Sequence, residues 1–256
     1  MMPSPFDLTG KIAIVTGGNG GIGLGMARGL ARAGAGIVIA GRNKEKSAEA
    51  AREIEALGAK ALAIAVDVTD KASVAAMVET TLTLLGKVDI LINNAGMSVR
   101  KPAHLLDLDD WNTVIDTNLT SAFICAKAVY PAMKQVGGGK IINIGSMMSI
   151  FGAGYAPAYA ASKGGIVQFT KSIAVSWAAD NIQANAILPG WIDTNLTQTA
   201  REQIPGLNEN VLNRTPAKRW GNIDDLAGAA VFLASSASDF VTGTAIPVDG
   251  GYSVQS

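Results

Sequence analysis

The sequence is poor in the residues that build disulfides and metal sites, because it has one cysteine and one histidine among 256 residues. The single cysteine, Cys125, excludes a disulfide within the chain. Its apolar neighbours predict a buried structural thiol, which fits a reducing cytoplasm. The sequence contains no cluster of histidine, cysteine and acidic residues with the spacing of metal ligands, so we expect no metal site.

The sequence also has no excess of positive or negative charge. The 21 basic and 21 acidic residues balance, and no basic tail or stripe stands out. Without such a surface the sequence does not favour binding to nucleic acid or to an anionic membrane.

Long apolar runs are absent as well. The longest uncharged stretch, residues 141–162, contains four glycines or prolines and several hydroxyls, so we expect no membrane span. The first residues, MMPSPFDLTGK, lack a basic region followed by an apolar run and therefore predict no secretory signal. Both observations favour a cytoplasmic protein.

What the chain does have is a regular alternation of short apolar runs and longer amphipathic segments. The runs that predict strands buried on both faces are KIAIVT, GIVIA, ALAIAVDV, VDILINN, GKIINIG, IQANAILPG and AIPVDGG. The segments that predict helices are residues 21–34, 44–57, 71–85, 108–135, 158–179 and 224–235. This alternation predicts an α/β fold: one doubly wound domain over residues 1–256, with a seven-stranded parallel sheet and helices on both faces.

Residues 191–220 interrupt the alternation between the sixth and seventh expected strands. They are rich in Thr, Asn and Arg. Because ligands of open α/β sheets bind beyond the carboxyl ends of the strands, we expect this insertion to be a substrate lid.

A glycine-rich turn, TGGNGGIG at residues 16–23, follows the first expected strand and opens the first helix. Residues without Cβ let backbone N–H groups approach a pyrophosphate, and the helix N-terminus adds a favourable dipole. The turn predicts a dinucleotide site, although a glycine turn without a ligand would show the same letters. The expected contacts come from Gly17, Asn19, Gly20, Gly21, Ile22 and Gly23.

The end of the second strand bears on the choice of cofactor. An acid there would bind both ribose hydroxyls of NAD(H) and repel a 2′-phosphate. This chain has Arg42 and Asn43 instead, and a guanidinium can fork onto a phosphate, with Asn43 or Lys44 helping. We expect NADP(H); NAD(H) remains the alternative if Arg42 only solvates its loop.

Two further strand ends should border the same nucleotide. Asp67 and Val68 end the third expected strand and could frame the adenine. The small residues of NNAG at 93–96 end the fourth and would let the adenosine ribose lie close; the expected contacts there are Asn94, Ala95 and Gly96.

A serine, a tyrosine and a lysine predict the chemistry. Ser146 ends the fifth strand, and Tyr159 and Lys163 are four residues apart, hence on one face of a helix. Tyrosine titrates near ~10 and is a poor base at neutral pH, but a lysine ammonium lowers that pKa. Tyr159 could then exchange a proton with a substrate hydroxyl held by Ser146. Taken alone, a surface Tyr–Lys pair would look the same.

Together the motifs resemble the short-chain dehydrogenase/reductase family over essentially the whole chain. The resemblance is carried by TGGNGGIG at 16–23, NNAG at 93–96, the asparagine of DTNLT, Ser146 thirteen residues before Tyr159, YAASK at 159–163 and PGWIDT at 189–194. It implies a single Rossmann domain, usually in a homotetramer, that binds NADP or NAD. Asn118 would then support a proton-relay water to Lys163, which would also bond the nicotinamide ribose. The nicotinamide would be contacted by Pro189, Gly190, Ile192 and Thr194.

The substrate is less constrained. SMMSIFG, RTPAKRWG and the C-terminal region are similar to the branch containing gluconate 5-dehydrogenases and 2-deoxygluconate 3-dehydrogenases, which implies a sugar acid or polyol. Arg100 and Lys101 could meet a carboxylate, and Asn195, Gln198 and Arg201 could bond hydroxyls. The expected substrate contacts are Ser146, Met148, Tyr159, Arg100 and Trp191.

Three alternatives stay open. A 3-oxoacyl-carrier-protein reductase would share the catalytic motifs, but the segment 108–135 lacks the basic patch that an acidic carrier requires. The apolar residues of the lid leave room for a reductase or dehydrogenase of apolar ketones or alcohols. A non-catalytic nucleotide-sensing protein is disfavoured because the Asn–Ser–Tyr–Lys set is complete. The apolar C-terminal strand could pair across a subunit interface.

Overall fold

A computed structural model describes residues 4–255, so the first three residues of the N-terminal segment considered above lie outside it. Its seven strands form one parallel sheet in the order β3-β2-β1-β4-β5-β6-β7. Their bounds are β1 Ile12–Thr16, β2 Gly36–Gly41, β3 Ala61–Ala65, β4 Ile90–Asn93, β5 Gly139–Ile144, β6 Ile182–Pro189 and β7 Ala245–Val248. The predicted doubly wound sheet is therefore confirmed.

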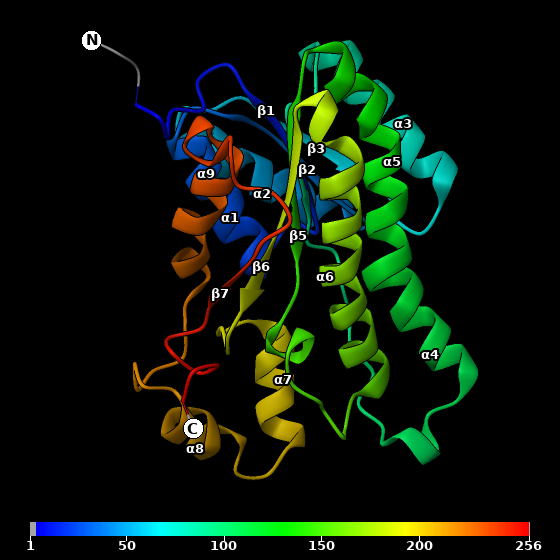
Figure 1. The fold of residues 1–256 in the computed structure, drawn as a ribbon, viewed down its shortest axis with the longest axis vertical. Helices are drawn as coiled ribbons and strands as arrows, with labels where there is room; N and C mark the ends of the chain where they lie inside the picture. Colours follow the sequence, from blue (N-terminus) through cyan, green and yellow to red (C-terminus); the bar gives the residue numbers. More distant parts are fainter. Residues whose placement is uncertain (1–3, 256) are drawn as a thin grey trace.

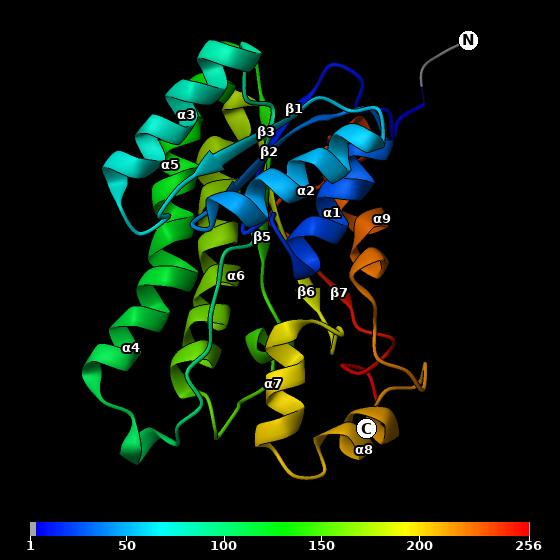
Figure 2. The same cartoon turned by 180° about the vertical axis from the view of Figure 1, so that it is seen from behind.

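Helices cover both faces of the sheet, as Figures 1 and 2 show. One face carries α1 (Gly21–Arg32), α2 (Lys44–Ala56) and α9 (Ala227–Ala234); the other carries α3 (Lys71–Leu85), α5 (Ser121–Gln135) and α6 (Pro157–Trp177). The apolar side chains of the strands pack into one core on each face. Central strands are fully buried, whereas the edge strands β3 and β7 are half-buried, because each pairs on one side only.

Helix ends follow local chemistry. Asp70 caps α3 by accepting a hydrogen bond from the Ala72 N–H at 2.9 Å, and Gly86 ends that helix with φ of 84°. A carboxylate satisfies a free N–H at a helix start, and glycine adopts the left-handed conformation easily.

The helical segment expected over residues 108–135 is present, but it contains a π turn that the sequence did not predict. α4 (Leu108–Ile115) passes into a wider π turn over Asp116–Thr120, and α5 follows. Asn118 lies in that turn, and its amide pairs with the main chain of Met97 through two hydrogen bonds of 2.8 and 2.9 Å. π turns inside helices are frequent at functional sites, and this one turns Asn118 toward the loop after β4.

Other element boundaries also differ from the sequence reading. β3 ends at Ala65, so Asp67 and Val68 lie in the following loop rather than in the strand. The segment expected to begin a helix at residue 224 starts as a 3₁₀ turn before α9. The remaining 3₁₀ turns are Ala103–Leu105, Met147–Ser149, Ala178–Asp180, Ile223–Leu226 and Ser236–Ser238.

The interruption at residues 191–220 folds into α7 (Asn195–Gln203) and α8 (Leu207–Arg214), which lie beyond the carboxyl ends of the strands in both views (Figures 1 and 2). Its two ends meet, because Ile192 and Gly221 form a parallel bridge and the Gly221 N–H donates to the Trp191 carbonyl at 2.9 Å. The rings of Trp191 and Trp220 meet edge to face with centroids 5.7 Å apart. Trp220 thus anchors the far end of the segment, as expected.

Within residues 4–255, every helix falls short of the combined length and apolar character that a membrane crossing requires.

Candidate active site

A cavity of about 1200 Å³ opens at the carboxyl edge of the sheet. It is bordered by the β1–α1 turn, the ends of β4 and β5, the start of α6 and the segment after β6. The predicted site residues that line it are Gly17, Asn19, Gly20, Gly21, Ile22, Arg42, Asn43, Asp67, Val68, Asn94, Ala95, Gly96, Arg100, Ser146, Met148, Tyr159, Lys163, Pro189, Gly190, Trp191, Ile192 and Thr194. Gly23 and Asn118 stand behind its wall.

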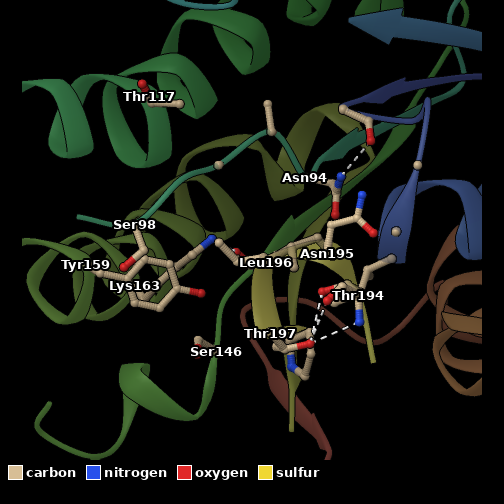
Figure 3. Close-up of a pocket in the computed structure, with 18 of the residues that line it drawn as sticks. Asn94, Ser98, Thr117, Ser146, Tyr159, Lys163, Thr194, Asn195, Leu196 and Thr197 are labelled. Atoms are coloured by element: carbon tan, nitrogen blue, oxygen red, sulfur yellow. Dashed lines mark hydrogen bonds between the residues drawn. The ribbon is translucent and has the colours of Figure 1, made fainter. Parts of the chain in front are cut away.

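The glycine turn is shaped by close contacts that exclude side chains. A Cβ on Gly17, whose φ is 62°, would lie 3.2 Å from the Ala95 Cα. A Cβ on Gly23 would lie 2.4 Å from the Gly17 carbonyl oxygen, so Gly23 supports the turn from behind instead of lining the cavity. Asn94 fixes the turn by donating to the Thr16 and Gly17 carbonyls at 3.0 and 3.1 Å (Figure 3).

This turn fits a dinucleotide. Gly20 and Gly21 line the cavity at the start of α1, where backbone N–H groups on residues without a Cβ can receive a pyrophosphate. A Cβ built on Gly21 would lie 3.6 Å from the methyl group of Thr194. The glycine turn and the segment after β6 therefore approach each other closely.

Beyond the turn, the cavity has an exposed polar end. Arg42 and Asn43 lie there, and the Asn43 side chain caps α2 by accepting from the Lys46 N–H at 2.9 Å. Hydrogen bonds from the Thr69 N–H and hydroxyl hold the pKa of Asp67 below its usual range, and the Arg42 charge adds to this.

Ser146, Tyr159 and Lys163 come together on one side of the cavity, with Asn94 and Thr194 on the other (Figure 3). The Lys163 Nζ is buried and donates to the Ile144 carbonyl at 2.7 Å. It lies 5.6 Å from the centroid of the Tyr159 ring. Burial lowers the pKa of Lys163 to about 8.

The expected lowering of the Tyr159 pKa is contradicted. Burial raises the pKa of this phenol above 10.0, although hydrogen bonding by the Ser146 hydroxyl and the charge of Arg100 oppose it. The physical reason is that desolvation of the phenolate outweighs these stabilising groups, and Lys163 directs its ammonium at the Ile144 carbonyl.

Ser146 is positioned by a 3₁₀ turn at residues 147–149. Its hydroxyl accepts a hydrogen bond from the Met148 N–H at 3.1 Å, and the Ser149 hydroxyl accepts from the Ser146 N–H, also at 3.1 Å. Met148 and Met147 both border the cavity, and Met147 is 2% exposed and also packs against the core.

Asn118 reaches the site only indirectly. Besides Met97, its amide contacts Ser162, donating to that hydroxyl at 3.0 Å. A Cβ on Gly96 would lie 3.3 Å from the Asn118 Oδ1 and 3.7 Å from the Lys163 Nζ, so Gly96 separates the two side chains.

The residues after β6 form the opposite wall. The Gly190 N–H donates to the Val248 carbonyl at 2.9 Å, and a Cβ on Gly190 would lie 2.6 Å from the Asp249 Cα. Ile192 is 3% exposed, and Thr194 caps α7. Glycine is therefore required where β6 and β7 approach at the cavity floor.

The two basic residues expected at the cavity mouth behave differently. Arg100 lines the cavity, and its guanidinium donates to the Gln203 Oε1 at 2.9 Å and to the Leu196 carbonyl at 3.0 Å, both in α7. Lys101 is paired with Asp107 and Asp110 and does not line the cavity.

Among the lid residues expected to bond hydroxyls, only two border the cavity, Asn195 and Gln198. Arg201 is paired with Asp193 and stacks over Trp220 at 4.5 Å from the ring centroid, which removes it from the site.

Sequence reasoning missed several polar residues that line the cavity: Lys46, Ser98, Thr117 and Tyr155. Lys46 stands in the stretch RNKEK at residues 42–46, and its place in the first turn of α2, next to Arg42, was a usable signal. Burial raises the pKa of Tyr155, which lies on the loop before α6. No spacing in the sequence distinguishes it from any loop tyrosine.

The remaining candidates have ordinary structural roles. Cys125 is buried, and burial raises the pKa of its thiol to about 12, as a structural residue requires. His104 lies exposed in a 3₁₀ turn. Across the described range 4–255, no three His, Cys, Asp or Glu side chains are grouped to hold a metal ion.

Comparison with known proteins agrees with this geometry. The family model described as enoyl-(acyl carrier protein) reductase matches residues 17–253. The 2-dehydro-3-deoxy-D-gluconate 5-dehydrogenase of Formosa agariphila is 44% identical over 247 residues, covering 96% of this chain and 94% of that protein. The gluconate 5-dehydrogenase of Gluconobacter oxydans is 42% identical over 255 residues, covering 98% of each.

Among solved structures, a gluconate 5-dehydrogenase from Burkholderia cenocepacia in complex with NADP and tartrate superimposes with a TM-score of 0.93. It is 43% identical and covers 98% of both chains. These matches span nearly the whole length of the protein. The chain therefore belongs to the short-chain dehydrogenase/reductase family and is an NAD(P)-dependent oxidoreductase acting on CH–OH groups.

Proposed function

We propose that this protein interconverts a secondary alcohol and a ketone on a sugar acid, with NADP(H) as the preferred cofactor. The observation that carries the proposal is that Ser146, Tyr159 and Lys163 line the same cavity as a glycine turn fit for a dinucleotide. The named activities of the similar proteins, on gluconate and 2-dehydro-3-deoxygluconate, support the sugar-acid class.

Proton transfer is assigned to Tyr159. Its phenol donates to the carbonyl oxygen in the direction of reduction and accepts from the hydroxyl in the direction of oxidation, while Ser146 holds that oxygen. When bound, the nicotinamide supplies or accepts the hydride. Because burial raises the pKa of Tyr159, the protonated phenol is the resting form and is ready for reduction; in the direction of oxidation the phenol must first lose its proton before it accepts that of the substrate hydroxyl.

Lys163 and Asn118 complete the set. The Lys163 ammonium lies beside the Tyr159 ring, where its charge favours the phenolate in the transition state. We assign to Asn118 the support of a water that passes protons to Lys163, since the two side chains flank Gly96.

The cofactor is assigned to the glycine turn and the strand ends. Gly17, Asn19, Gly20, Gly21 and Ile22 receive the pyrophosphate. Asp67, Val68 and the Asn94–Gly96 segment border the adenosine, and the nicotinamide lies against the wall of Pro189, Gly190, Ile192 and Thr194. Arg42 reads the 2′-phosphate, because no acid stands in its place.

The substrate is assigned to the space between Tyr159 and the lid, residues 191–220. Met148 and Trp191 provide apolar walls there, and Arg100 provides positive charge for a carboxylate. The Arg100 guanidinium already donates two hydrogen bonds to α7, so only its remaining N–H groups are free to bind a carboxylate.

The test follows nicotinamide absorbance with purified protein and both cofactors. Substrates are gluconate, 2-deoxygluconate, 2-dehydro-3-deoxygluconate, simple polyols, secondary alcohols and acetoacetyl thioesters. We expect turnover of a sugar acid with NADP(H). Turnover of thioesters or apolar alcohols alone would overturn the sugar-acid assignment, and cofactor binding without any turnover would support a nucleotide sensor.

A further inference from the structure

The side chain of Lys46 reaches from α2 across the glycine turn. A Cβ built on Gly20 would lie 2.8 Å from the Lys46 Nζ and 3.1 Å from its Cε. Gly20 has φ of 172° and ψ of 173°, an extended conformation that any residue adopts. A side chain at this position would therefore meet the flexible end of Lys46 and push it aside, whereas the backbone conformation of Gly20 does not require glycine.

The contacts around Lys46 hold this arrangement together. Asn19 of the turn donates to the Ser47 hydroxyl at 3.0 Å, which ties the turn to the first turn of α2. Gly41 allows this approach, because a Cβ there would lie 2.6 Å from the Asn19 Nδ2. The Asn43 cap fixes the start of the same helix, so Lys46 emerges at a defined place above Gly20.

The charge at this end of the cavity is not neutralised. Both Lys46 and Arg42 line the cavity, and within residues 4–255 neither forms an ion pair with a carboxylate. Asp67 feels the Arg42 charge but bonds Thr69 instead. Two unpaired cations at one end of a cavity favour an anionic group that carries more than one charge.

We propose that Lys46 is a second specificity residue for the adenosine 2′-phosphate of NADP(H), and that Gly20 admits it. Arg42 supplies the planar fork and Lys46 a compact point charge from the first turn of α2. The proposal rests on the NADP(H) preference of the proposed function, and it goes beyond Arg42 as the sole reader of that phosphate.

The test measures binding without catalysis. Isothermal titration calorimetry compares adenosine 2′,5′-bisphosphate with 5′-AMP, which lacks the 2′-phosphate. Lys46→Met should weaken binding of the bisphosphate by about tenfold and that of 5′-AMP by less than about twofold, as loss of a charge-assisted contact predicts. Lys44→Met is the matched control: the sequence offered Lys44 as a helper of Arg42, but Lys44 does not line the cavity, although it lies in the same helical turn as Lys46. Equal weakening of both nucleotides, or equal effects of the two variants, would overturn the proposal.

A second variant tests the part played by Gly20. Gly20→Ala should lower the preference for the bisphosphate because its Cβ displaces Lys46, and the double variant should lower it no further. Additive losses would mean that Gly20 does not act through Lys46. These readouts are independent of turnover: absence of sugar-acid activity with a Lys46-dependent preference would refute the substrate assignment alone. Equal affinity of the wild-type protein for both nucleotides would refute the cofactor assignment and the role of Lys46.

Discussion

At the residue scale, the site depends on how two neighbouring side chains share a buried environment. Burial raises the pKa of Tyr159 and lowers that of Lys163, so the enclosed site favours the uncharged form of each. The Ile144 carbonyl accepts a hydrogen bond from Lys163 and thereby keeps the amine in place beside the phenol. The end of β5 therefore fixes Lys163 where its Nζ lies 5.6 Å from the centroid of the Tyr159 ring.

Replacing Tyr159 tests the assigned proton transfer. Tyr159→Phe should lower turnover by about 10²–10⁴, the usual size of a general acid–base contribution, with NADPH affinity changed by less than about threefold. Tyr130→Phe is the matched control, since that hydroxyl bonds Asp180 on the far side of α6 and does not line the cavity. Turnover by the Tyr159 variant within about tenfold of the wild type would contradict the assignment.

The lowered pKa of Lys163 predicts a pH dependence of stability. Between about pH 8 and 10.5 the unfolded chain binds more protons at this residue than the folded chain, so its contribution to the free energy of unfolding rises with pH in that window. Urea unfolding at the two ends of the window gives the free energy of unfolding of the wild type and of Lys163→Met. The value for the wild type minus the value for the variant should increase toward high pH. Lys171→Met, an exposed lysine of the same helix, is the control. A difference that stays constant or shrinks would show that burial does not depress the pKa.

Much of the site follows from short-range pattern, and the exceptions have a common cause. Glycine spacing and the Tyr159–Lys163 interval are local properties of a turn and a helix, so the sequence predicted which residues line the cavity. The raised pKa of Tyr159, the pairing of Arg100 with α7 and the reach of Lys46 over Gly20 depend on segments far apart in the chain. No spacing in the sequence carries that information.

At the element scale, the strands of the sheet follow from local sequence patterns, whereas some helix boundaries depend on contacts between distant segments. Apolar runs predicted all seven strands, because a strand buried on both faces leaves a continuous apolar signal. The π turn at Asp116–Thr120 was missed because it is specified by the pairing of Asn118 with Met97, which lies across the loop after β4. The short helices of residues 191–220 likewise pack on their own small apolar cluster.

The contact between Arg100 and α7 predicts how the lid is held. Arg100→Met should loosen α7 and raise the KM for the sugar acid by about tenfold, as expected when charged hydrogen bonds are lost at a partly exposed site. Limited trypsin digestion should cleave residues 191–220 faster in this variant. Lys101→Met is the control, because Lys101 pairs with Asp107 and Asp110 and does not contact the lid. Unchanged KM and digestion rate would remove Arg100 from both roles.

At the scale of the whole molecule, the sheet ends in two edge strands of different character. β3 is flanked by α2 and α3, whereas β7 is followed directly by the C-terminal segment. Phe240 and Val254 are fully or largely exposed near that edge. An exposed sheet edge with apolar neighbours is suited to pairing with another copy of the chain.

The family resemblance implies a homotetramer, and we expect β7 to form one of its interfaces. Light scattering coupled to size-exclusion chromatography should give a mass about four times the 26.3 kDa of one chain, at protein concentrations that differ by about tenfold. A monomer at both concentrations would contradict the assembly and the use of β7 as an interface strand.

The bridge between Ile192 and Gly221 has a consequence for how the protein can be changed. Because Ile192 and Gly221 pair outside the sheet and the Gly221 N–H donates to the Trp191 carbonyl, the two ends of residues 191–220 lie next to each other. We therefore expect that this segment can be exchanged for that of a homologous enzyme with the strand order unchanged. The incoming segment must keep the approach of Thr194 to the glycine turn and the hydrogen bonds between α7 and Arg100.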